Sequence, residues 1–123
     1  MEKNTFDIIH HKDEGVNSLI LNGYLDAHTA PKLEAEINTL ITEGSKYILV
    51  NFNSLDYISS AGLGVFMAFI EDIRDNGGDI KMCSMKPKVY SVFDLLGFPV
   101  IFDIEKDEVT AYSKFKELIA QNA

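Results

Sequence analysis

The first quarter of the chain predicts two short strands joined by a tight turn. Apolar and β-branched residues are frequent over residues 5–11 and 16–22, as in strands of a half-buried sheet. Between them, Lys12-Asp13-Glu14-Gly15 combines polar residues with a glycine, which is typical of a hairpin turn. Gly23 is expected to end the second strand, and a loop over residues 24–28 follows. The chain therefore opens with an antiparallel pair.

The next segment changes to the period of a helix. Thr29 is a plausible N-cap, Pro31 suits a first helical turn, and Gly44 is a natural stop. Residues 47–52 then form the most continuous apolar run of the chain, which predicts a central strand that is buried on both faces. The apolar positions of the helix recur three or four residues apart, at Leu33, Ile37, Leu40 and Ile41.

The second half repeats the alternation of helix and strand. A helix is expected to follow Ser59-Ser60 and to run to about Asn76, where Gly77-Gly78 ends it. A strand over residues 79–84 comes next. A third helix opens at Pro87 and has Gly97 as its C-cap.

The last quarter predicts a short strand and a final helix. Residues 100–102 are expected to form an edge strand. The tail then carries apolar residues at helical spacing, which predicts an amphipathic helix containing Val109, Tyr112, Phe115 and Ile119.

The predicted order of elements is β-β-α-β-α-β-α-β-α, an α/β class. Strands that alternate with helices imply crossover connections and a mixed, mostly parallel sheet, here of four to five strands with about four helices. No linker, repeat or low-complexity segment interrupts the pattern. We expect a single domain over residues 1–123 with its core at about 5–118, and a monomer at this size.

Composition and charge restrict the class of function. The 46% of apolar residues suffices for a core, and no run is long enough for a membrane span or a secretory signal, so we expect a cytoplasmic protein. The net charge of −8 repels nucleic acid and anionic lipid, and Lys81, Lys86 and Lys88 make up only a small basic cluster. We therefore expect no nucleic-acid partner and no membrane partner. We also expect no cofactor and no metal. Cys83 is the single cysteine, and we expect it to be a buried small side chain.

The segment Ser59-Ser60-Ala61-Gly62-Leu63-Gly64 carries the candidate chemistry. It lies between the central strand and a helix, where open α/β sheets place their sites. Each glycine in the first turns of a helix costs up to about 1 kcal/mol, which suggests that a close approach by another molecule compensates. Unpaired N–H groups and the helix dipole at this end would stabilise a phosphoserine by about 0.3–1 kcal/mol.

Three stretches together resemble one protein family. Residues 59–64 are similar to the phosphorylation motif of STAS-domain anti-sigma factor antagonists, usually Asp-Ser-Ser/Thr-Gly-Leu-Gly or Ser-Ser-Ala-Gly-Leu. Residues 23–33, Gly-Tyr-Leu-Asp-Ala-His-Thr-Ala-Pro-Lys-Leu, are similar to the family's loop and first helix, and residues 92–98, Val-Phe-Asp-Leu-Leu-Gly-Phe, to the end of its third helix. The resemblance covers about residues 6–115.

This resemblance implies a partner-switching cycle without catalysis by the chain itself. The unphosphorylated antagonist binds an anti-sigma factor, a serine kinase of the GHKL type, and phosphorylation by that kinase ends the binding. A PP2C-type phosphatase reverses the modification. By position the acceptor is Ser60, and the alternative is Ser59, which stands where many members have Asp. The partner-binding residues are expected to be Asp26, Ser59, Ser60, Ala61, Gly62, Leu63 and Gly64.

Other interpretations of the same residues stay open. The serines can serve only as a helix cap, Asp26 can close a turn, and the two glycines can permit tight internal packing. An enzyme is disfavoured, since no P-loop and no Gly-x-Ser-x-Gly elbow is present. A STAS regulator in a non-sigma output, or a subunit of a lipid-transport complex, remains the alternative function.

Overall fold

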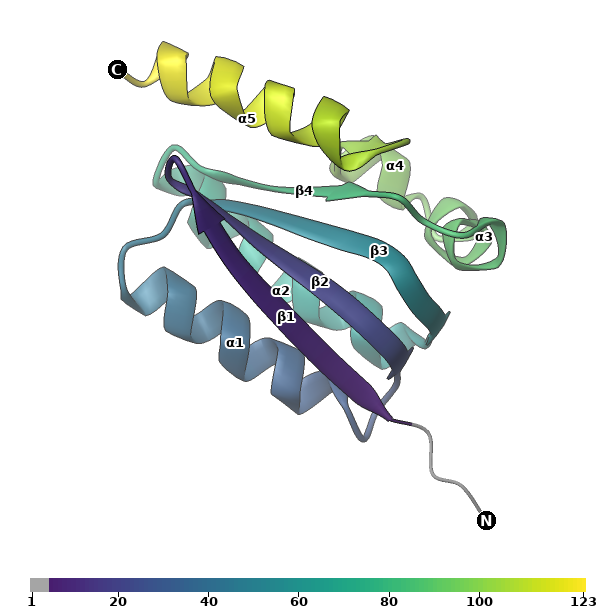
Figure 1. The fold of residues 1–123 in the computed structure, drawn as a ribbon. Coiled ribbons are helices and arrows are strands. Elements are labelled where there is room, and N and C mark those ends of the chain that lie inside the picture. Colours follow the sequence, from purple (N-terminus) through teal and green to yellow (C-terminus); the bar gives the residue numbers. More distant parts are fainter. Residues whose placement is uncertain (1–4) are drawn as a thin grey trace.

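The computed structural model describes residues 5–123, and within them the chain forms one five-stranded sheet with five helices (Figure 1). The strands lie side by side in chain order. They are β1 (Phe6–Asp13), β2 (Val16–Leu25), β3 (Tyr47–Ile58), β4 (Asp79–Cys83) and β5 (Ile104–Glu105). The helices are α1 (Ala30–Thr42), α2 (Ser60–Asp75), α3 (Pro87–Leu95), α4 (Phe98–Ile101) and α5 (Glu108–Gln121).

The pairing of the strands confirms the predicted mixed α/β sheet. Strand β1 runs antiparallel to β2, and β2, β3, β4 and β5 run parallel to one another. The turn between β1 and β2 consists of Glu14 and Gly15, whose φ angles of 48° and 86° are those of a two-residue hairpin turn. The predicted initial hairpin is therefore confirmed.

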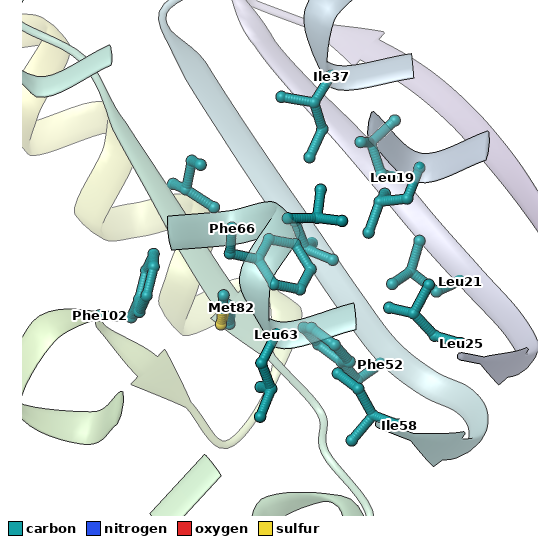
Figure 2. Packing of buried hydrophobic residues seen from close by; sticks show 14 of the residues in the cluster. Leu19, Leu21, Leu25, Ile37, Phe52, Ile58, Leu63, Phe66, Met82 and Phe102 are labelled. Atoms are coloured by element: carbon teal, nitrogen blue, oxygen red, sulfur yellow. The ribbon is translucent and has the colours of Figure 1, made fainter. Parts of the chain in front are cut away.

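Helices cover both faces of the sheet, although not equally. Helices α1 and α2 pack on one face, where Leu19 and Leu21 of β2, Ile37 of α1 and Phe66 of α2 enter a common core (Figure 2). A smaller cluster under α5 lies on the other face and consists of Val16, Leu49, Cys83, Ala111 and Phe115. Leu49 and Val50, which are consecutive in β3, thus enter opposite cores. This confirms the predicted central strand, buried on both faces.

Strands β2 and β3 are longer than the sequence indicates. Strand β2 continues past Gly23 to Leu25, and β3 continues past Phe52 to Ile58. Gly23 does not end the strand: it has a φ of 94°, and a side chain there would collide with the backbone of Thr5. The two strands stay paired through irregularities in their register, so polar residues occur inside them without breaking the ladder.

The edge strand predicted at residues 100–102 is wrong. These residues end the short helix α4 and the turn after it, and the fifth strand is the two-residue β5 that pairs with Met82 and Cys83. The helical turn places Phe98 and Phe102 on the same side, with ring centroids 5.5 Å apart, so both rings are buried. Gly97, with a φ of 77°, allows the chain to leave α3 and enter α4.

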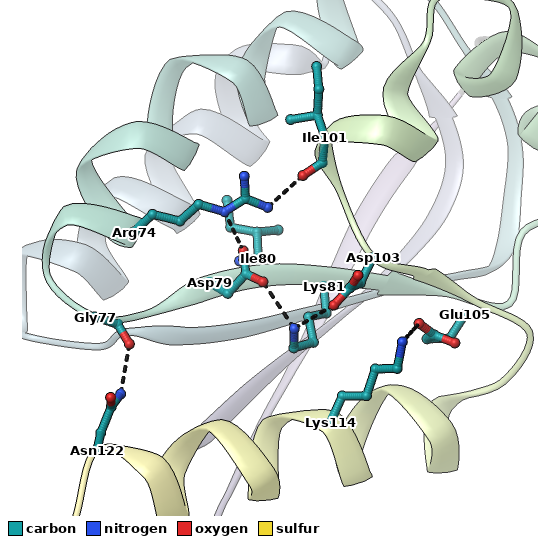
Figure 3. A network of polar contacts seen from close by, with 10 residues as sticks. All are labelled: Arg74, Gly77, Asp79, Ile80, Lys81, Ile101, Asp103, Glu105, Lys114 and Asn122. Atoms are coloured by element: carbon teal, nitrogen blue, oxygen red, sulfur yellow. Dashed lines mark hydrogen bonds and ion pairs between the residues drawn. The ribbon is translucent and has the colours of Figure 1, made fainter.

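A partly buried ion-pair network joins β4 to the segment before β5 (Figure 3). The Nζ of Lys81 lies 3.0 Å from Asp79 and 2.7 Å from Asp103, while Arg74 donates to Asp79 at 2.9 Å. Burial lowers the pKa of Lys81, but its bonds to Asp103 and Asp79 outweigh that effect and raise the pKa above its ordinary value. Lys81 therefore does not belong to a surface cluster with Lys86, which instead pairs with Asp56 at 2.6 Å.

Candidate phosphorylation and partner-binding site

The two segments expected to contact a partner lie next to each other. Asp26 follows the end of β2, and Ser59 follows the end of β3. These parallel strands are neighbours, with Leu25 opposite Ile58. The backbone N–H of Ser59 donates to the carbonyl oxygen of Leu25 at 2.9 Å. The loop before α1 and the start of α2 thus form one rim at the carboxyl end of the sheet.

The geometry separates the two adjacent serines. Ser59 occupies the N-cap position of α2 in an extended conformation, but its side chain makes no capping hydrogen bond. Its Oγ is buried and has no hydrogen-bond partner among the described residues. Ser60 is the first residue of α2 and is exposed. The N-cap prediction holds for the backbone position of Ser59 and not for its hydroxyl.

The amino end of α2 is electrostatically open. The first turn contains no acidic residue, and the side chain of Ser59 satisfies none of its N–H groups. Free N–H groups and the positive end of the helix dipole favour an anion at this point. A phosphate on Ser60 would stand beside these groups.

The two glycines of the motif have different surroundings. Gly62 is buried, and a Cβ atom there would meet the side chains of Leu25 and Ile58, so this glycine permits close packing inside the protein. Gly64 is exposed, and its Cβ would have nothing within 4 Å. Internal packing explains the first glycine, whereas no contact with residues 5–123 outside α2 requires the second.

The remaining predicted residues divide between surface and core. Ala61 is exposed beside Ser60. Leu63 is buried and points with Phe66 into the core under α2 (Figure 2). Leu63 therefore holds α2 on the sheet and presents no side chain to a partner.

Asp26 closes the turn before α1. Its Oδ1 accepts hydrogen bonds from the N–H groups of His28 at 2.9 Å and Thr29 at 3.2 Å. The hydroxyl of Thr29 donates to the carbonyl of Tyr24 at 2.8 Å and makes no capping bond to α1. Asp26 therefore acts as a turn residue, which is one of the interpretations that the sequence left open. Its side chain is half-buried on the rim.

Several apolar side chains of α2, α3 and α4 are exposed. Met67 lies on the outer side of α2, one turn after Gly64, and is exposed. Leu95 and Leu96 at the end of α3, and Val100 on α4, are exposed as well. The sequence signal was present in the run Leu95-Leu96 next to Gly97, because a helix that ends there cannot bury two adjacent leucines on one face.

Among residues 5–123, no group of three or more His, Cys, Asp or Glu side chains could hold a metal ion. His10 instead bonds through Nε2 to Oδ1 of Asn17 at 2.7 Å. None of the helices over these residues is long and apolar enough to cross a membrane.

Comparison with known proteins identifies the family. The STAS domain model matches residues 8–111. BtrV of Bordetella bronchiseptica, which carries the name anti-sigma factor antagonist, is 33% identical over 85% of this chain and 90% of its own length. The anti-sigma factor antagonist SpoIIAA in its unphosphorylated form has a similar fold, with a TM-score of 0.77 at 23% identity over 92% of this chain and 97% of the other. Its phosphorylated form from Bacillus gives a TM-score of 0.69 at 22% identity over 90% and 99%. This chain therefore belongs to the STAS-domain family among anti-sigma factor antagonists.

Proposed function

We propose that this chain is an anti-sigma factor antagonist that is switched by phosphorylation of Ser60. The observation that carries this proposal is the contrast at the start of α2. Ser60 is exposed beside an uncapped helix end, whereas the Oγ of Ser59 is buried. A kinase can reach the Ser60 hydroxyl without moving the backbone. It can reach the Ser59 hydroxyl only if the end of the helix opens.

In the unphosphorylated state, the outer side of α2 is the proposed contact surface for the anti-sigma factor. Ser60, Ala61 and Gly64 leave this side of the helix nearly free of bulk, and Met67 adds an exposed apolar contact. Asp26 lies across the rim. It directly follows Leu25, whose carbonyl oxygen accepts the hydrogen bond from the N–H of Ser59. A flat, small-residue surface with an apolar neighbour suits close backbone approach by a partner.

Phosphorylation then alters this surface without unfolding the domain. The phosphate adds close to two negative charges, and the N–H groups of the first turn of α2 stabilise it by about 0.3–1 kcal/mol. The same charges are desolvated and repelled if the partner closes over them. Binding is therefore lost while the fold is kept.

The partners in this proposal are a GHKL-type serine kinase, which is itself the anti-sigma factor, and a PP2C-type phosphatase. The names of the relatives support an anti-sigma factor as the partner. We further propose that the protein acts as a monomeric single domain in the cytoplasm. A client other than a sigma factor would use the same surface and the same switch.

The test is phosphorylation by the cognate kinase followed by mapping of the modified residue by mass spectrometry. We expect the phosphate on Ser60, no modification of Ser60→Ala, and normal modification of the matched control Ser59→Ala. In a binding assay with the same kinase, Ser60→Ala should keep its affinity and Ser60→Asp should lose at least about ten-fold. Phosphate on Ser59, or equal affinity for the two Ser60 variants, would overturn the proposal.

A further inference from the structure

The sheet face that carries α5 is only half covered in the described part of the chain. Helix α5 begins where Glu108 accepts a hydrogen bond from Asn51 at 2.8 Å, and it ends where Asn122 donates to the Tyr47 hydroxyl at 3.0 Å. It therefore lies over the amino-terminal part of β3, as Figure 1 also shows. Beyond Asn51, the helix that contacts β3 besides α2 is α3, and its Phe93 packs on Phe52 in the core on the opposite face. Among residues 5–123, the cluster under α5 includes only the amino-terminal part of β3.

Apolar side chains gather on the uncovered half. Strand register places Ile9 opposite Ile20 and Tyr24 opposite Tyr57, on the face away from α1 and α2. Ile9 and Tyr57 are each 47% exposed. The rings of Tyr24 and Tyr57 lie against each other with centroids 5.9 Å apart. These four residues are termed the open-face patch.

A groove adjoins the open-face patch at the border with α5. It has a volume of about 360 Å³ and lies between the hairpin and the start of α5. Val109, one of its lining residues, is 76% exposed although it is apolar. The full lining is His11, Asp13, Ser18, Glu108, Val109, Tyr112 and Ser113.

Carboxylates outnumber cations around the patch, where Lys32 pairs with Asp7 and Lys116, over the ring of Tyr112, pairs with Glu14. The residues of β1, β2 and β3 that share this face, together with those that line the groove, include the carboxylates of Asp7, Asp13 and Glu108 and no lysine or arginine. Lys32 is the ion-pair partner of Asp7, at 3.4 Å, and Asp7 is 73% exposed in that pair. Asp13 and Glu108 form no ion pair among the described residues, and an apolar strip beside these two carboxylates selects an occupant that is both apolar and basic.

We propose that the open-face patch and its groove dock a basic amphipathic helix of a partner protein. The apolar side of that helix covers Ile9, Ile20, Tyr24 and Tyr57, and its lysines or arginines pair with Asp7, Asp13 and Glu108. A second copy of this chain is a poor occupant, since its net charge is −8 and the carboxylates would face each other across the contact.

This surface lies on a different face of the sheet from the helix that Ser60 begins. Ser60 begins a helix that packs on the opposite face of the sheet from the open-face patch. Tyr24 and Tyr57 nevertheless lie two residues before Asp26 and Ser59 of the rim, so only the part of the patch around Ile9 and Ile20 is far from the anti-sigma contact. The docking proposal and the proposed function can fail separately.

The test uses the full chain and two designed helical peptides of about 18 residues, or five turns. Both peptides have the same leucine and tryptophan face; one has lysine and arginine on its polar side, and the other has glutamate. In a titration of the ¹⁵N-labelled chain, the basic peptide should shift amide signals of β1, β2 and the end of β3. The acidic peptide should bind at least about ten-fold more weakly.

Variants decide whether the patch carries the binding. The double variant Ile9→Ser/Tyr57→Ser should lower the affinity for the basic peptide at least about ten-fold. The control Val100→Ser also removes an exposed apolar side chain, and it should leave this affinity unchanged. If the double variant does not fold, Asp7→Lys at an exposed position serves the same purpose through charge reversal. Ser60→Asp should bind like the wild type.

Three results would overturn the proposal. Equal binding of the acidic peptide would remove the charge argument, and signal shifts confined to α2 or α3 would place the contact elsewhere. Concentration-dependent dimers in sedimentation that disappear in the Ile9→Ser/Tyr57→Ser variant would assign the patch to a second copy of the chain.

Discussion

A Cβ atom on Gly62 would lie 2.7 Å from Cγ of Leu25 and 3.1 Å from Cγ1 of Ile58. Helix α2 can approach the ends of β2 and β3 this closely only because residue 62 has no side chain. Gly62→Ala gains up to about 1 kcal/mol of helix propensity but overpacks this contact at a cost of about 1–3 kcal/mol. We expect a net loss of about 1–2 kcal/mol, measured by urea unfolding.

Gly64→Ala is the matched control. It lies on the same helix, and its new methyl group would have nothing within 4 Å. The free energy of unfolding should rise by about 0.5–1 kcal/mol through helix propensity. If Gly62→Ala unfolds with the same free energy as Gly64→Ala, the close contact with Leu25 does not limit the position of α2.

The same Gly64→Ala variant tests the proposed contact surface. The protein is expected to be at least as stable as the wild type and yet to bind its anti-sigma factor about ten-fold more weakly, because the methyl group holds the partner backbone away from Ser60. Calorimetric titration measures this affinity. An exposed small-residue change on the other face of the sheet, Ala120→Gly in α5, should leave the affinity unaltered once its lower stability is taken into account. An unchanged affinity for Gly64→Ala would mean that no partner approaches this side of α2.

Ser59→Ala should behave unlike an ordinary N-cap substitution. Removing a capping serine commonly costs about 1 kcal/mol, whereas the Ser59 Oγ makes no capping bond and is buried without a partner. Deleting an unsatisfied buried hydroxyl should change the free energy of unfolding by less than about 0.5 kcal/mol or increase it. The measurement is again urea unfolding, with Asp107→Ala as the comparison, since the side chain of Asp107 does cap α5 through Thr110 at 2.8 Å. A loss in Ser59→Ala as large as that in Asp107→Ala would contradict the observed geometry.

The order of elements was predictable because the chain's local signals agree with its topology. Apolar periodicity places α1, α2 and α5, and the glycines after α1 and α2 have the positive φ that ends a helix. The strand ends were not predictable in the same way. Residues 53–58 are polar and apolar in an irregular order, and only their pairing with β2 through register shifts makes them a strand.

The candidate site also combines features that the sequence indicates with features that it does not. The motif at residues 59–64 could be located from its glycines and its place after a strand. The burial of the Ser59 hydroxyl and the different roles of Gly62 and Gly64 depend on Leu25, which is more than thirty residues away in the sequence. The ion-pair network was also missed, because no local pattern indicates that Lys81 points into the protein toward Asp103.

The thiol of Cys83 should be unreactive in the folded protein. Burial raises its pKa to about 11 from the ordinary value of 9.0, and the side chain is fully buried between β3 and α5. The pKa difference alone lowers the thiolate fraction at neutral pH by about 100-fold. Labelling with a thiol-specific disulfide reagent at pH 8 should be slow for the native protein and fast in urea. Fast labelling of the native protein would show that β4 opens readily under α5.

The ion pairs of Lys81 should give the protein a stability that depends on pH at both extremes. The pKa of Lys81 lies above its ordinary value of 10.5, so its contribution is present below that value and is lost as the pH rises through the folded pKa. The hydrogen bond from Lys81 lowers the pKa of the Asp103 carboxyl below its ordinary value of 3.8. That contribution is present above 3.8 and is lost as the pH falls through the lower, folded value.

Replacing the two partners should therefore have unequal effects. Asp103 is 44% exposed, so Asp103→Asn should lower the free energy of unfolding at pH 7 by about 1 kcal/mol or less, and the difference from the wild type should shrink below pH 3.8. Lys81→Met should cost more, about 1–2 kcal/mol, because Asp79, which is 13% exposed, loses its buried cation and keeps only the partly exposed Arg74. Lys116→Met, which removes an exposed pair with Glu14, is the control and should show no measurable change. Urea unfolding at pH 3, 5 and 7 measures all three variants, and an Asp103→Asn difference that grows toward pH 3 would reverse the assigned sign.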